Sequence, residues 1–198
     1  MVTRRPPGLL VLTDRTQTGG RPLPDVVRAA VAGGARAVVL REKDLRRPFR
    51  AELASTLATM LHPVDGILLV ASGPDHGDGV HLAATDPFPH PAPPVVGRSC
   101  HRAAELRDAA TEGCTYATLS PIFPSASKPG YGPPLGPGAL QDAPLPVLAL
   151  GGVTASNAGD CLAAGAAGVA VMGEIMRAED PAQVVAALLD ALTPTVAR

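Results

Sequence analysis

The chain has 198 residues, 46% of them hydrophobic, and its 17 basic and 18 acidic side chains leave a net charge of −1. Because the charges are balanced and scattered, the sequence has no cluster of basic residues of the kind that binds nucleic acids or anionic membranes. The first apolar run stops at Asp14, too early for a signal peptide or a membrane span, and the three cysteines show no CxxC spacing. We therefore expect a reduced, cytoplasmic protein.

Eight short apolar runs rich in Val, Leu and Ala follow one another along the chain. Their continuous hydrophobicity is typical of parallel strands that are buried on both faces. Amphipathic patterns that predict helices lie between several of these runs, and another closes the chain. The predicted strands are 9–14, 37–42, 66–71, 79–83, 95–100, 116–121, 147–152 and 168–173, and the predicted helices are 24–34, 48–61, 103–113, 155–165 and 181–193.

Eight strands that alternate with helices predict an α/β fold of the compact (β/α)₈ TIM-barrel type. We expect one domain over residues 1–198, with the barrel at about 9–193. The segment 74–78 is too short for a helix and 89–94 is interrupted by prolines, so the helices after strands three and four are expected to be shortened or missing. An open doubly wound sheet is the alternative.

In such a barrel the active site lies at the carboxyl ends of the strands. Arg41 and Lys43 follow the second strand two positions apart, so both can face the barrel mouth, where two cations suit a diphosphate or a carboxylate. The alternative is that they only form ion pairs with Glu42 and Asp44. Asp86 follows the fourth strand and is its single acid.

Ser99 and His101 end the fifth predicted strand, two positions apart. Imidazole can both accept and donate a proton near neutral pH, so His101 is a candidate general acid/base, with a purely structural histidine as the alternative.

After the sixth strand, Lys128 lies between Ser125, Ser127 and a glycine turn. It is a further candidate cation unless it is only solvated. No histidine or cysteine cluster has zinc-ligand spacing.

Glycines follow the last two strands. Gly151 and Gly152 end the seventh strand, and Gly173 ends the eighth just before a short helical segment. Backbone amides at these two places form the usual phosphate site of the barrel, because unpaired N–H groups and a helix N-terminus favour an anion. The alternative is a simple tight turn, and Glu174 weakens the phosphate interpretation because its carboxylate would have to point away from the anion.

The ordered motifs LTDR, LREK, DGVHL, GRSCH, SPIFPSASKPGYG, LALGGV and GVAVMGEI resemble the thiamine phosphate synthase/TenI family of small (β/α)₈ barrels, from the first strand to the last helix. The resemblance implies one of two activities. Synthases join hydroxymethylpyrimidine diphosphate to thiazole phosphate with Mg²⁺ and release pyrophosphate. TenI-type tautomerases aromatise a thiazole carboxylate phosphate by moving a proton.

Several positions depart from the synthase pattern. Val39 stands where the synthases carry Gln, and Ala71 and Ser72 stand where they carry Asn and a magnesium-binding Asp. The second magnesium ligand of the pattern is kept as Asp86. In the family, two hydroxyls and a lysine after the sixth strand contact the pyrophosphate and the thiazole, and Ser125, Ser127 and Lys128 keep these groups. Ser99 and His101 match an element that both branches share. In the tautomerase branch this histidine moves the proton.

With one acid left, the sequence favours a metal-free, TenI-like thiazole tautomerase in thiamine biosynthesis, in which His101 moves the proton and no cofactor is needed. The glycine amides would hold the phosphate, and Arg41, Lys43 or Lys128 would meet the carboxylate. One alternative is a synthase that binds Mg²⁺ through Asp86, with Asp14 or Asp75 as replacement for the missing acid. Another is a non-catalytic protein that binds a phosphorylated thiazole. The apolar helix 181–193 leaves a homo-oligomer open.

Overall fold

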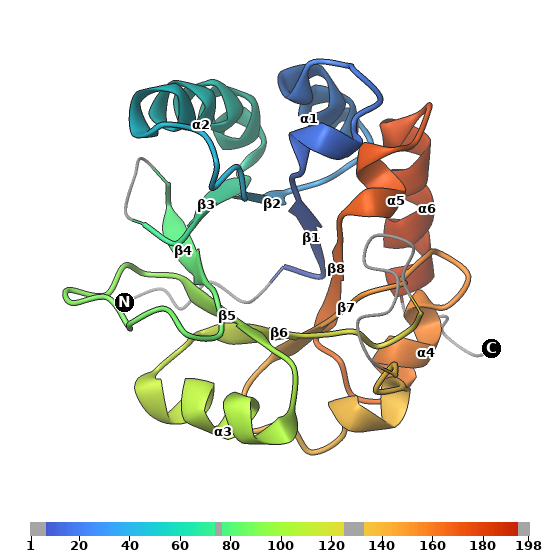
Figure 1. Cartoon of the computed structure of the whole chain (residues 1–198). Coiled ribbons are helices and arrows are strands. Elements are labelled where there is room, and N and C mark those ends of the chain that lie inside the picture. Colours follow the sequence, from blue (N-terminus) through green and yellow to red (C-terminus); the bar gives the residue numbers. More distant parts are fainter. Residues whose placement is uncertain (1–6, 74–76, 125–132, 194–198) are drawn as a thin grey trace.

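The computed structural model describes residues 7–73, 77–124 and 133–193. Its eight parallel strands close into a barrel in sequential order, which confirms the TIM barrel and rules out the open sheet (Figure 1). Six predicted strands lose one or two residues at the carboxyl end, mostly where polar side chains or glycines leave the ladder, and the third and fifth end where predicted. The strands are β1 (Leu9–Leu12), β2 (Ala37–Leu40), β3 (Ile67–Ala71), β4 (Gly79–Leu82), β5 (Val96–Cys100), β6 (Tyr116–Leu119), β7 (Val147–Leu150) and β8 (Gly168–Val171).

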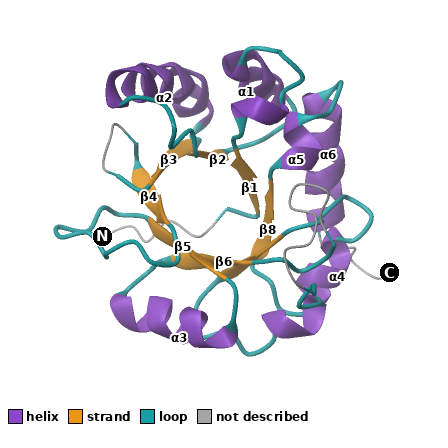
Figure 2. Cartoon of the chain, viewed as in Figure 1, coloured by secondary structure: helices purple, strands orange, loops and turns teal. Residues whose placement is uncertain are grey.

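Helices lie outside the ring of strands (Figure 2). None of the helices in the described ranges is long and apolar enough to cross a membrane. They are α1 (Leu23–Ala32), α2 (Arg47–Leu61), α3 (Ala103–Glu112), α4 (Ala158–Ala163), α5 (Gly173–Met176) and α6 (Pro181–Leu192), with short 3₁₀ turns η1 (Arg15–Gln17), η2 (His62–Val64) and η3 (Pro137–Leu140).

The ends of these helices follow local chemistry. α3 stops at Gly113, whose φ of +92° suits a residue without a side chain. The predicted helix 155–165 shortens to α4 because the Asn157 side chain is used in the preceding turn. There it accepts a hydrogen bond from the Thr154 amide at 2.9 Å and donates one to the Gly152 carbonyl at 3.0 Å.

The described residues between β3 and β4 and between β4 and β5 contain no helix, as expected from their sequence. A buried arginine covers this sector. Arg98 of β5 is only 4% exposed, and its guanidinium donates to the carbonyls of Ala83, Ala84 and Asp86 at 3.0, 3.2 and 2.9 Å. It also lies 2.7 Å from the Glu112 carboxylate of α3. One paired cation thus satisfies carbonyls that follow β4.

The core has two parts, one between the strands and the helices and one inside the barrel. Because side chains alternate along a strand, Cys100 faces the helices, whereas Ser99 borders the barrel mouth. Inside, Gly97 makes room for Tyr116, since a Cβ at Gly97 would lie 2.1 Å from the tyrosine ring. A large polar side chain is therefore buried below the mouth.

Candidate active site at the carboxyl end of the barrel

A cavity of about 730 Å³ opens at the carboxyl ends of the strands, where the sequence places the site. Residues from β1 to β8 or their loops border it. Its walls toward β1, β3, β4 and β8 are formed mainly by small or apolar side chains. Seven predicted site residues border this cavity, namely Arg41, Lys43, Ser99, His101, Gly151, Gly152 and Gly173. Ser125, Ser127 and Lys128 lie outside the described residues.

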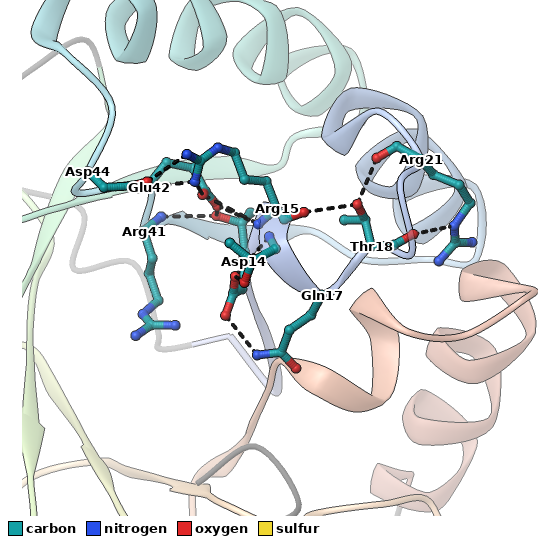
Figure 3. A network of polar contacts seen from close by, with 10 residues as sticks. Asp14, Arg15, Gln17, Thr18, Arg21, Arg41, Glu42 and Asp44 are labelled. Atoms are coloured by element: carbon teal, nitrogen blue, oxygen red, sulfur yellow. Dashed lines mark hydrogen bonds and ion pairs between the residues drawn. The ribbon is translucent and has the colours of Figure 1, made fainter.

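Glu42 joins the loops after β1 and β2 (Figure 3). Its side chain is 3% exposed and accepts a hydrogen bond from Thr13 Oγ1 at 2.8 Å, while Arg15 lies 3.4 Å from the carboxylate. Arg15 also pairs with Asp44 at 2.6 Å, and this ion pair holds the pKa of Asp44 below its ordinary value. The two acids considered as partners of the mouth cations therefore bind Arg15 instead.

Arg41 points away from Glu42 and Asp44 in Figure 3. Its backbone amide donates to Thr13 Oγ1 at 3.0 Å, and its guanidinium contacts the sulfur of Met172, which follows β8. Lys43 borders the same cavity. Arg41 and Lys43 thus border the cavity, while the acids next to them in the sequence, Glu42 and Asp44, are bound to Arg15.

Asp86 lies beside the cavity and does not border it. One carboxylate oxygen accepts hydrogen bonds from the Ser72 hydroxyl and, at 2.8 Å, from the Ala83 amide. Partial burial acts to raise the pKa of Asp86, but these hydrogen bonds and the charges of Lys43 and Arg98 lower it below the ordinary value. Asp86 is therefore ionised at neutral pH and fixes the turn that follows β4.

The carboxylates do not form a complete metal cage. Asp14, one candidate for a second acid, uses its carboxylate to accept hydrogen bonds from Thr16 and Gln17, and Asp75 lies outside the described residues. Within the described ranges, no group of three or more His, Cys, Asp or Glu side chains is placed to hold a metal. Mg²⁺ usually binds through one or two carboxylates together with substrate phosphates and water. Asp86, a single carboxylate beside the cavity, could therefore give such an ion only part of its ligands, and the others would have to come from a bound phosphate and water.

His81, in the middle of β4, also borders the cavity. Its Nδ1 lies 2.8 Å from Tyr116 Oη and its Nε2 lies 3.0 Å from Ser99 Oγ. Burial, aided by nearby cations, lowers the pKa of His81 to about 3, so the ring is neutral at physiological pH. The alternation of side chains along β4 already puts position 81 inside a barrel, and this is the signal that could have indicated it.

His101 is oriented by the backbone. Its Nδ1 lies 3.0 Å from the Ser120 carbonyl oxygen, and its own amide donates to the Glu105 carboxylate at 2.7 Å. The Ser120 hydroxyl lies farther from Nδ1, at 3.3 Å, and the nearer carbonyl can only accept. Nδ1 is therefore assigned the hydrogen, and the basic lone pair of the neutral ring belongs to Nε2. The ring can therefore act as a base through Nε2.

The glycines after β7 have backbone conformations that other residues rarely adopt. Gly151 has a φ of +93° and Gly152 a φ of +65°. The Gly151 carbonyl accepts from the Phe123 amide at 2.9 Å, which ties this loop to the one after β6. Gly173 begins α5, and Glu174 borders the cavity as well. The predicted phosphate loops thus meet at one part of the mouth.

Gly152→Ala is expected to destabilise the fold by about 1–3 kcal/mol and to impair the site, because a Cβ would lie 2.3 Å from the Pro124 carbonyl and the positive φ would be strained. Urea unfolding checks this. The matched control is Gly159→Ala in α4, where a Cβ meets nothing within 4 Å and stability should rise by about 0.5–1 kcal/mol. Equal stability of the wild type and Gly152→Ala would contradict the expectation.

A closed parallel barrel with cations, hydroxyls and glycine loops at its carboxyl end belongs to the class of TIM-barrel proteins whose sites are built from the βα loops. The sequence model of the family described as thiamine monophosphate synthase matches residues 9–175. The chain belongs to this family.

Similar proteins cover nearly the whole chain. The putative thiamine-phosphate synthase of Geobacter sulfurreducens is 38% identical over 94% of each chain, and the thiamine-phosphate synthase of Roseiflexus castenholzii is 35% identical over 91% of this chain and 86% of its own. The structure of thiamine phosphate pyrophosphorylase from Pyrococcus furiosus has a TM-score of 0.82 at 28% identity, covering 93% of this chain and 94% of that one.

These comparisons confirm the resemblance and the assignment to thiamine biosynthesis. The family match by itself does not separate the synthase branch from the TenI branch. The relatives are named as synthases, which favours the alternative activity over the tautomerase that the sequence favoured. Ser72 in place of the family's acid does not exclude a synthase, because a metal that also binds substrate phosphates needs few protein carboxylates.

Proposed function

We propose that this chain is a thiamine phosphate synthase that joins hydroxymethylpyrimidine diphosphate to thiazole phosphate. The observation that carries the proposal is the pair Arg41 and Lys43 at the cavity, with the acids Glu42 and Asp44 turned to Arg15. Positive charge fixed in a partly enclosed site stabilises a leaving diphosphate better than it would in water. The names of the relatives support the same activity.

In this reaction the thiazole nitrogen forms a bond to the exocyclic methylene carbon of the pyrimidine. The bond from that carbon to the diphosphate oxygen breaks, and its electron pair leaves with pyrophosphate. Arg41, Lys43 and the Ser99 hydroxyl border the cavity, and we assign to them the stabilisation of this negative charge. Mg²⁺, when bound beside Asp86 through the substrate, supplies further charge neutralisation.

The thiazole phosphate is assigned to the loops after β7 and β8. Backbone N–H groups near Gly151, Gly152 and Gly173 would hold it, since amides in turns and at a helix N-terminus attract anions. These loops lie on the β7 and β8 side of the mouth, whereas Arg41 and Lys43 come from β2. Two phosphate-bearing substrates can therefore be held from different sides of one cavity.

The thiazole tautomerase is the second candidate, and one observation favours it. His101 borders the cavity with Nδ1 bound to the Ser120 carbonyl, so Nε2 is the nitrogen that can accept a proton from a ligand. A synthase needs no proton transfer at the bond that forms. A role for His101 in turnover of a thiazole carboxylate phosphate would therefore separate the two activities.

The test incubates the purified protein with both synthase substrates and Mg²⁺ and measures thiamine phosphate as fluorescent thiochrome. The expected result is product that a chelator abolishes. A separate incubation with thiazole carboxylate phosphate alone tests the tautomerase. If no thiamine phosphate forms while a known synthase converts the same substrates, the proposal is wrong. Turnover in the second incubation would then indicate the tautomerase, and binding without turnover would indicate a binding protein.

A further inference from the structure

A chain of three polar side chains runs from the closed interior of the barrel to the cavity. It begins at Tyr116 of β6, passes through His81 of β4 and ends at Ser99 of β5. Tyr116 is fully buried and His81 is 4% exposed, whereas Ser99 is partly exposed and borders the cavity. His81 also borders the cavity, but both of its ring nitrogens are engaged within the chain, so Ser99 is the member whose polar group can bond a ligand.

The direction of the hydrogen bonds in this chain can be worked out from the partners. Within the described part of the protein, the Tyr116 hydroxyl meets His81 Nδ1 and no other polar group, and no water reaches it because its exposure is 0%. A buried O–H that donates to nothing is costly, corresponding to about 5- to 150-fold in population. Tyr116 therefore donates to Nδ1.

This direction fixes the rest of the chain. A neutral histidine that accepts at Nδ1 carries its hydrogen on Nε2, and the buried His81 stays neutral with a pKa of about 3. Nε2 must then donate to Ser99 Oγ, which lies 3.0 Å away. With one lone pair of its oxygen occupied in this way, the Ser99 hydroxyl turns its own hydrogen toward the cavity.

We propose that Tyr116 and His81 are positioning residues that make Ser99 an obligatory hydrogen-bond donor to its ligand. The ligand atom beside Ser99 must then be an acceptor. This inference deepens the proposed synthase function, on which its catalytic part rests. In that reaction the fitting acceptor is the diphosphate oxygen that gains charge as its bond to carbon breaks, and a donor already aimed at it favours the transition state.

The first test needs no substrate. Two-bond ¹H–¹⁵N spectra of the full chain labelled with [¹⁵N]histidine report which ring nitrogen carries the hydrogen, and the His81 signals are those lost in His81→Gln among five histidines. We expect an unprotonated Nδ1 and a protonated Nε2 for His81 that do not titrate between about pH 5 and 8. A protonated Nδ1 in the wild type would overturn the proposal.

Tyr116→Phe tests the positioning role. Without the tyrosine O–H the His81 tautomers become mixed, and kcat should fall by about 2- to 10-fold while the KM for thiazole phosphate is unchanged. The matched control is Thr118→Val on the same strand and face, since the buried Thr118 hydroxyl has no hydrogen-bond partner in the described structure. Thr118→Val should keep both the His81 tautomer and kcat.

Ser99→Ala provides the final comparison. It should lower kcat by about 10²-fold, and Tyr116→Phe should add nothing further in this background, because its effect acts through Ser99. Additive losses would show that Tyr116 only supports the fold and would overturn the positioning role. If the expected tautomer is found but the wild type forms no thiamine phosphate, the proposed function fails while the assigned hydrogen-bond direction stands.

Discussion

Asp86→Asn is expected to lower kcat for thiamine phosphate formation by about 10²- to 10³-fold, the loss typical of removing one electrostatic contact in a transition state. Asp86 is ionised at neutral pH because hydrogen bonds from Ser72 and Ala83 and the charges of Lys43 and Arg98 outweigh its partial burial. Asparagine keeps an oxygen that can accept from the Ala83 amide but removes the charge that would bind Mg²⁺. The loss should therefore appear as a higher Mg²⁺ requirement as well as a lower kcat.

The matched control for this change is Asp108→Asn, which removes the same charge from an exposed position on α3. Its kcat and Mg²⁺ dependence should equal those of the wild type. Circular dichroism and urea unfolding of both variants establish that they are folded. Wild-type turnover in folded Asp86→Asn would remove Asp86 from the metal site and contradict this prediction.

Acid is expected to destabilise the protein through His81, well before the carboxylates titrate. The pKa of His81 is about 3 in the fold against 6.5 in the unfolded chain, with burial as the largest cause. Between these values the unfolded chain binds a proton that the folded chain does not, so the free energy of unfolding falls as the pH decreases below 6.5. The slope approaches about 1.4 kcal/mol per pH unit. Above pH 6.5 this contribution is fully present.

Urea unfolding between pH 7 and 5 measures this slope. Asp14, Asp44 and Asp86 have lowered pKa values, and their ordinary value is 3.8, so their contributions are lost mainly at lower pH. His81→Gln should remove the slope in this window whatever its stability at pH 7. His90→Gln, at an exposed position, should retain it. An unchanged slope in His81→Gln would mean that His81 is not buried as a neutral ring.

Much of the architecture was predictable because it depends on local patterns. Continuous runs of Val, Leu and Ala predicted all eight strands, and glycines such as Gly113 marked where helices end. Most of the site was predictable for a related reason. The carboxyl ends of parallel strands in a closed barrel converge, so Arg41, Lys43 and His101 had to meet once the strand ends were known.

The partners of these residues were not predictable. Glu42 and Asp44 were candidates to neutralise the adjacent cations, but barrel closure brings them to Arg15, 27 and 29 positions away. The branch of the family also could not be read from one missing acid. Whether Asp86 suffices for Mg²⁺ depends on the ligands that a bound diphosphate contributes, and these are not encoded in the spacing of the carboxylates.

The sequence by itself determined the barrel, the family and the end of the barrel at which the polar residues gather, because periodicity and strand ends are local properties of the chain. Only the tertiary structure decided how those residues are oriented. The bonds of His81 to Ser99 and Tyr116 join residues 18 and 35 positions apart on three strands. They exist because closure of the barrel buries these groups together, where each hydrogen must find an acceptor.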